Sequence, residues 1–123
     1  MKAIGEKVWA IPGGHVPLRS SGEEPRSTSR DELCVLNAGH ADTQLRVTLY
    51  FADHEPVGPY QLLVPAQRVR QVRFNDLIDP QALPLDTPYA ALVVADHPVV
   101  VQFTRTDTSQ AANAIATTLA FPA

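Results

Sequence analysis

The sequence predicts an all-β fold: a single-domain antiparallel β-sandwich of jelly-roll type with about eight short strands. Eleven prolines are spread along the 123 residues, and hardly any stretch of helical length before residue 98 lacks one. A proline inside a helix costs about 3 kcal/mol, so long helices are improbable. Apolar and polar residues alternate with the two-residue period of a strand, most clearly in QLRVTLYF, residues 44–51. Clusters of Gly, Pro, Asn and Asp separate these segments, which is typical of sandwiches.

The composition is that of one ordinary globular domain spanning residues 1–123. Hydrophobic residues make up 45% of the chain and charged residues 19%, with a net charge of −3, which excludes wholesale disorder. Cys34 is the single cysteine, so no internal disulfide can form and a reducing compartment is favoured. No run reaches the roughly 18 apolar residues that span a bilayer, and no signal-peptide core is visible. We therefore expect a cytoplasmic protein whose membrane contacts are peripheral.

The first third of the chain predicts two strands around a long loop. Residues 6–11 form the first strand, which ends at Pro12-Gly13-Gly14. Trp9 within it is expected to anchor the core, with its indole N–H bonded to backbone. Residues 15–31 are rich in Ser, Arg, Glu, Pro and Gly and predict an excursion with little regular structure. Residues 32–37 form the second strand.

The middle of the chain predicts a corner and two more strands after the strand at 44–51. Two prolines around Gly58 favour a defined turn at 56–59, followed by a strand over 60–64 that Pro65 ends. From 68 to 74 the apolar alternation slips by one residue, which predicts a β-bulge near Arg70-Gln71. Asn75 or Asp76 is then expected to cap a single helical turn.

The last third predicts a hairpin and a final strand. Residues 89–95 are apolar on both faces, as in a central strand, and Asp96-His97-Pro98 is expected to turn the chain into a strand over 99–106. Ser109 is expected to cap a brief turn. Residues 115–121 alternate as the last strand.

Groups that would perform catalysis or bind a metal are sparse. The histidines are isolated from one another, with no pair at the spacing of a metal site; they are His15, His40, His54 and His97. Asp53-His54-Glu55 lies in a turn and is expected to face water. Cys34 is expected to be a buried small apolar residue rather than a nucleophile, because nothing near it in sequence would lower its pKa. The sequence therefore predicts a protein that is not an enzyme and has no cofactor and no metal.

Arg68, Arg70 and Arg73 form the densest basic cluster and are the candidate binding residues. Guanidinium groups bind phosphate or carboxylate through paired hydrogen bonds. A solvated face or a salt bridge between subunits is the more common role for such a strand. Nucleic-acid binding is a weak alternative, because the net charge is −3 and no series of aromatic residues accompanies the arginines.

Several blocks of unusual composition resemble the Anabaena sensory rhodopsin transducer family, in order from about residue 8 to 114. They include Trp9-Ala10-Ile11, Leu36-Asn37-Ala38-Gly39, Glu55-Pro56-Val57-Gly58-Pro59-Tyr60, Val64-Pro65-Ala66, Val72-Arg73-Phe74-Asn75-Asp76-Leu77 and Val100-Val101-Gln102. The resemblance implies a small jelly-roll β-sandwich, similar to carbohydrate-binding modules and assembled as a homotetramer. It also implies a non-catalytic protein that takes a signal from the cytoplasmic face of a retinal-bearing membrane receptor.

Three functional hypotheses follow. The leading one is a signalling adaptor that binds a sensory rhodopsin-type receptor and a downstream protein through its surface, including the rim that carries Arg68, Arg70 and Arg73. The second is a carbohydrate- or small-ligand-binding module, which would stack sugars on exposed aromatics such as Tyr50. The third is a DNA-associated regulator, which would need the arginines aligned across the tetramer.

Overall fold

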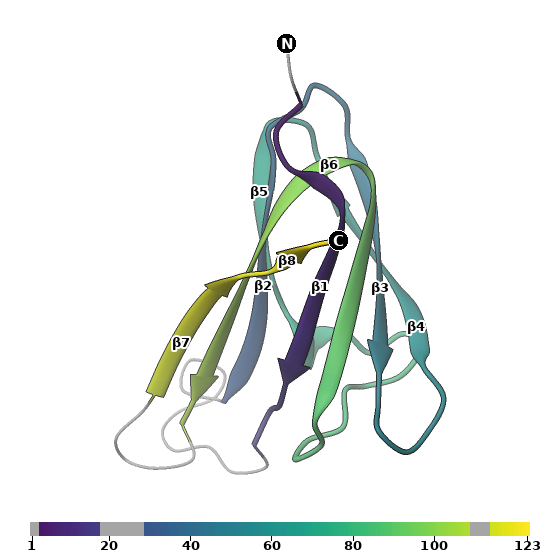
Figure 1. Cartoon of the computed structure of the whole chain (residues 1–123), viewed down its shortest axis with the longest axis vertical. Coiled ribbons are helices and arrows are strands. Elements are labelled where there is room, and N and C mark those ends of the chain that lie inside the picture. The colour runs from purple at the N-terminus through teal and green to yellow at the C-terminus, as the bar shows by residue number, and fades with distance from the viewer. Residues whose placement is uncertain (1–2, 18–28, 109–113) are drawn as a thin grey trace.

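The computed structural model describes residues 3–17, 29–108 and 114–123. This part of the chain contains eight antiparallel strands and a single 3-10 turn, which confirms the all-β prediction (Figure 1). None of its helical residues form a segment long or apolar enough to cross a membrane. Most of the predicted loop at 15–31 and the turn capped by Ser109 lie outside the described residues. The elements are β1 (Glu6–Gly14), β2 (Arg30–Asn37), β3 (Thr43–Tyr50), β4 (Val57–Val64), β5 (Arg68–Arg73), η1 (Phe74–Asp76), β6 (Tyr89–Asp107), β7 (Ala114–Leu119) and β8 (Phe121–Pro122).

The strands form two halves that share β6. The first half has the order β4-β3-β6-β1-β8, and in the second half β2 pairs with both β5 and β6 while β7 pairs with the other edge of β6. Buried side chains from both halves form one hydrophobic cluster. The core therefore lies between the two halves, and the alternate side chains of each strand face outward.

The predicted hairpin at 96–98 is wrong, because β6 is one continuous strand of 19 residues. It pairs with β3 up to Ala95 and with β1 as far as Val99, and from Val100 onward it pairs with β2. Pro98 lies where the strand changes partners, so its missing N–H removes no ladder hydrogen bond. In Figure 1 the strand bends over the top of the molecule from one half to the other.

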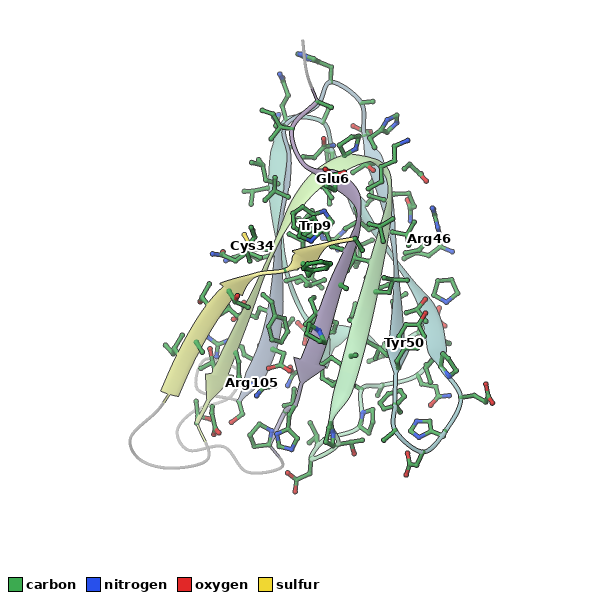
Figure 2. The ribbon with its side chains drawn as sticks, in the orientation of Figure 1. Glu6, Trp9, Cys34, Arg46, Tyr50 and Arg105 are labelled. Carbon is green, nitrogen blue, oxygen red and sulfur yellow. The ribbon has the colours of Figure 1, made fainter. Side chains whose placement is uncertain are left out.

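Trp9 anchors the core as predicted. Its side chain is only 4% exposed, and its indole N–H donates to the carbonyl oxygens of Glu6 and Val99, both at 3.0 Å. Figure 2 shows it between the strands of the two halves. Because Glu6 precedes Trp9 on β1 and Val99 follows the bend of β6, the ring fastens β1 to the point where β6 changes partners.

The predicted bulge in β5 is also wrong. The pairing with β2 runs without interruption from Glu32 opposite Arg73 to Asn37 opposite Arg68. Among the described strands β5 pairs with β2 alone, and it is exposed on both faces over most of its length. Its apolar residues are therefore not tied to a core face, and the irregular alternation does not report a change of register.

Smaller differences concern the ends of elements. β1 continues through Pro12 to Gly14, and the last strand is split at Ala120 into β7 and β8. The helical turn forms over Phe74–Asp76, so Asn75 and Asp76 lie within it and no side chain caps it. The predicted burial of Cys34 is wrong: the residue is half-buried and faces outward, because the alternate positions of β2 carry the buried residues.

Candidate functional site

The three predicted binding arginines do not converge. Arg68 and Arg70 alternate along β5 and share one face, whereas Arg73 lies on the opposite face. The Arg70 Nη1 donates to the Leu63 carbonyl of β4 at 2.8 Å, and the Arg68 Nη1 donates to the carbonyl of Gln67 at 3.0 Å. Arg73 is partly buried, with its Nε 4.0 Å from an Asp76 carboxylate oxygen.

Arg68 and Arg70 nevertheless form an exposed basic rim at the edge of the second half. β5 has no strand partner among the described residues on the side away from β2. Two guanidinium groups on such an edge are well placed to meet an acidic surface, and in water their attraction is weak, reversible and sensitive to salt. We call Arg68 and Arg70 the basic rim below.

The aromatic residues and histidines offer little for the alternative functions. Tyr60 and Tyr89 are buried, so the aromatic side chains accessible for stacking on a sugar include Tyr50, 42% exposed, and Phe121, 67% exposed, which lie on different strands. His54 stacks on Phe51 and bonds to its neighbour Asp53. The described residues contain no group of three or more metal-binding side chains.

A cluster around the buried carboxylate of Asp31 was not predicted from the sequence. Asp31 is fully buried, and its Oδ2 accepts hydrogen bonds from the Tyr89 hydroxyl at 2.6 Å and the His15 backbone N–H at 2.9 Å. Its Oδ1 accepts a hydrogen bond from the Nε of Arg105 at 3.3 Å. The available signal was that Asp31 is in phase with the buried Leu33 along β2.

Burial and hydrogen bonding act in opposite directions on the pKa of Asp31 but in the same direction on the pKa of Tyr89. Burial raises the pKa of Asp31, and the bonds from Tyr89, Arg105 and the His15 backbone offset part of that rise. Burial also raises the pKa of Tyr89 far above its usual value, and the neighbouring Asp31 adds to that rise. Tyr89 therefore stays a hydrogen-bond donor across the physiological pH range.

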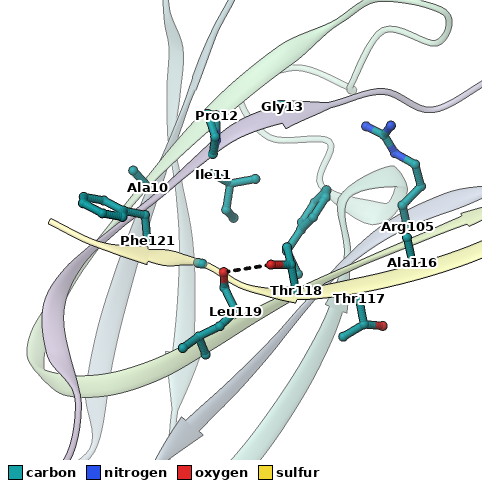
Figure 3. A pocket seen from close by; sticks show the side chains of 12 residues that line it. Ala10, Ile11, Pro12, Gly13, Arg105, Ala116, Thr117, Thr118, Leu119 and Phe121 are labelled. Atoms are coloured by element: carbon teal, nitrogen blue, oxygen red, sulfur yellow. Dashed lines mark hydrogen bonds between the residues drawn. The ribbon is translucent and has the colours of Figure 1, made fainter.

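Arg105 extends from this cluster into a groove between β1 and β7. The groove has a volume of about 400 Å³ and is lined mainly by apolar side chains (Figure 3). Among its lining residues Arg105 alone is charged.

A second apolar surface lies on the outer face of the second half. Pairing places Leu36 beside Val69 and Val100, and places Leu119 beside Gln102 on the same face. Val69 is 62% exposed, although it is an aliphatic residue within a strand. Four exposed apolar side chains on this face, with Gln102, Thr104 and Thr117 between them, define the outer patch: Leu36, Val69, Ile115 and Leu119.

Comparison with known proteins gives a consistent result. The family model described as Anabaena sensory rhodopsin transducer matches residues 4–122. The solved structure named "Anabaena sensory rhodopsin transducer" is 45% identical, covering 84% of this chain and 97% of that one, with a TM-score of 0.75. A Thermotoga maritima protein, "Thermotoga maritima 1070", is 25% identical over 96% of this chain and 95% of its own, with a TM-score of 0.81. A search of curated proteins finds no match.

Proposed function

The chain belongs to the Anabaena sensory rhodopsin transducer family, and on that basis we propose that it is a cytoplasmic signalling adaptor. It binds the cytoplasmic face of a sensory rhodopsin-type membrane receptor and passes the signal to a downstream protein by direct contact. The observation that carries this proposal is the family match over nearly the whole chain, supported by 45% identity to a protein named as a transducer.

The same family membership supports action by binding, without catalysis or a cofactor. Of the two alternatives, a sugar-binding module has a single exposed tyrosine, Tyr50, in its favour. A DNA-associated regulator would use Arg68, Arg70 and Arg73 together, but Arg73 lies on the opposite face of β5 from the other two. The adaptor is therefore the better supported function.

We further propose that the adaptor is a homotetramer and that the outer patch is one of its subunit contacts. Large exposed apolar side chains gathered on one sheet face favour an interaction site. A patch on a sheet face can be self-complementary across a two-fold axis, as symmetric oligomers require. The half-buried Cys34 lies on the same face and would become less accessible on assembly.

Replacing Val69 by aspartate is expected to break the tetramer, because it places a charge beside Leu36 at the β5 side of the outer patch. Light scattering at micromolar concentration measures the assembly. Ile78→Asp is the matched control, since Ile78 is similarly exposed and lies outside the patch. A wild-type monomer would contradict the assembly, and a tetrameric Val69→Asp variant would show that the patch is not a contact.

Reversing the basic rim with Arg68→Glu and Arg70→Glu is expected to slow association with the receptor at least tenfold at low salt. Charges at a rim act mainly on the association rate. The difference in association rate between the variant and wild type should shrink at high salt, and the dissociation rate should change little. The measurement is surface-based kinetics with Anabaena sensory rhodopsin in nanodiscs.

The control for this experiment is the double variant Lys7→Glu and Arg46→Glu, which makes the same change in charge on the first half of the sandwich. It should associate like wild type. If the rim variant is folded, keeps its assembly and associates as fast as wild type, the rim is not the docking site.

A further inference from the structure

The groove beside Arg105 arises from the way the C-terminal strands cross between the two halves. β7 pairs with β6 in the second half, and after Ala120 the chain passes to β8, which pairs with Trp9 and Ala10 of β1 in the first half. Beyond Ala10, β1 and β7 separate and leave two strand edges facing a common space. The side chains of Phe103 and Arg105 on β6 line this space between them.

The groove is apolar at one end and cationic at the other. Figure 3 shows Phe121 at one end and Arg105 at the opposite end, with Ile11 between them. From Ala116, opposite Arg105, to Phe121 the chain spans about 16 Å at roughly 3.3 Å per residue. No acidic side chain lines the groove in the described part of the chain.

Arg105 is held in place from behind, by a carboxylate that does not reach the groove. Its Nε donates to Asp31, which is itself fixed by the Tyr89 hydroxyl and the His15 backbone. Within the described residues, the two terminal nitrogens of Arg105 have no hydrogen-bond partner. A guanidinium fixed through Nε keeps its terminal donors free for a carboxylate, and little side-chain freedom remains to be lost on binding.

We propose that this groove binds a small amphiphilic carboxylate. Its carboxylate bonds to the terminal nitrogens of Arg105, and its apolar tail lies along Ile11 and Phe103 toward Phe121. A volume of about 400 Å³ falls in the range of small-molecule pockets, roughly 300–1,000 Å³. The single positive charge at one end matches one acidic head group. This site is independent of receptor docking and would give the transducer a second, chemical input.

Calorimetric titration with decanoate tests the proposal. Decanoate is expected to bind at least tenfold more tightly than decanol, which has the same tail without the charge. Ala116→Glu provides the sharpest variant, because Ala116 lies directly opposite Arg105 on β7. Its new carboxylate would occupy the guanidinium and weaken decanoate binding at least tenfold, while Asp31 keeps its partner.

Gln61→Glu is the matched control, since it adds the same charge on β4, far from the groove in the strand order. It should bind decanoate like wild type. Arg105→Gln gives an independent check, and thermal melts of all variants show that each is folded. Equal affinity for decanoate and decanol, or unchanged binding by Ala116→Glu, would overturn the proposal.

Two other occupants give distinct results. If a second copy of the chain fills the groove, light scattering will show decanoate binding only together with dissociation of the assembly. If the groove takes a peptide, an apolar pentapeptide with a free C-terminus will bind more tightly than decanoate, and its amidated form will not. Either result would replace the small carboxylate as the occupant.

Discussion

Replacing Trp9 by alanine is expected to lower the free energy of unfolding by about 3–5 kcal/mol. The change removes the largest side chain of the core and leaves a cavity. It also leaves the carbonyl oxygens of Glu6 and Val99 without their indole donor. Chemical denaturation followed by circular dichroism measures the loss, because the variant has no tryptophan fluorescence.

Tyr50→Ala is the control for this experiment. Tyr50 is also aromatic, but it lies on an exposed strand face and its loss should change stability by no more than about 0.5 kcal/mol. Trp9→Phe keeps most of the apolar volume and should fall between the two. A Trp9→Ala variant that unfolds at the wild-type midpoint would show that the ring contributes no packing energy.

Replacing Asp31 by alanine is expected to cost about 2–4 kcal/mol, because each buried donor left without its acceptor costs roughly 1–3 kcal/mol, whereas the Arg105 side chain is 38% exposed and can turn to water. The substitution leaves the Tyr89 hydroxyl and the Arg105 Nε without their acceptor inside the protein. Denaturation measures the effect. Asp96→Ala removes a carboxylate from an exposed ion pair with Arg46 and should cost at most about 1 kcal/mol. Similar losses in the two variants would contradict this difference.

The pH dependence of stability provides a second readout of Asp31. Because its pKa is raised in the folded protein, the native state binds a proton more tightly than the unfolded chain does. Stability should therefore fall as the pH rises from the ordinary value of 3.8 through the raised pKa, and then level off. Asp31→Asn does not ionise and should lack this fall relative to wild type. A rise in stability across the same pH window would mean that the hydrogen bonds to Asp31 lower its pKa by more than burial raises it.

The alternation of apolar and polar residues correctly predicted the strands that have one buried and one exposed face. In β3 the side chains of Leu45, Val47 and Leu49 point into the core and alternate with polar residues, so the period of two was sufficient. β5 lies at an edge without a core face of its own. Its irregular alternation therefore predicted a bulge that is absent from its pairing with β2. Whether a strand is central or at an edge depends on the order of strands in the sheet.

The sites depended on contacts between distant parts of the chain. Tyr89 and Arg105 meet Asp31 from 58 and 74 positions away, so no local spacing could have linked them. The groove exists only because the chain crosses between the halves at Ala120. By contrast, the arginines of β5 could be identified from composition. Which face of the sheet each one occupies follows only from the pairing register with β2.

The sharing of β6 between the two halves also determines when this domain can fold during its synthesis. The indole of Trp9 cannot donate to the Val99 carbonyl until that residue, 90 positions later in the sequence, has been synthesised. At roughly 5–20 residues per second, the ribosome takes about 5 to 18 seconds to make that length of chain. The β3–β4 pair can close early, whereas β1 has no pairing partner until the C-terminal third emerges. The nascent chain therefore exposes its apolar N-terminal strands to proteases and chaperones until translation is nearly complete.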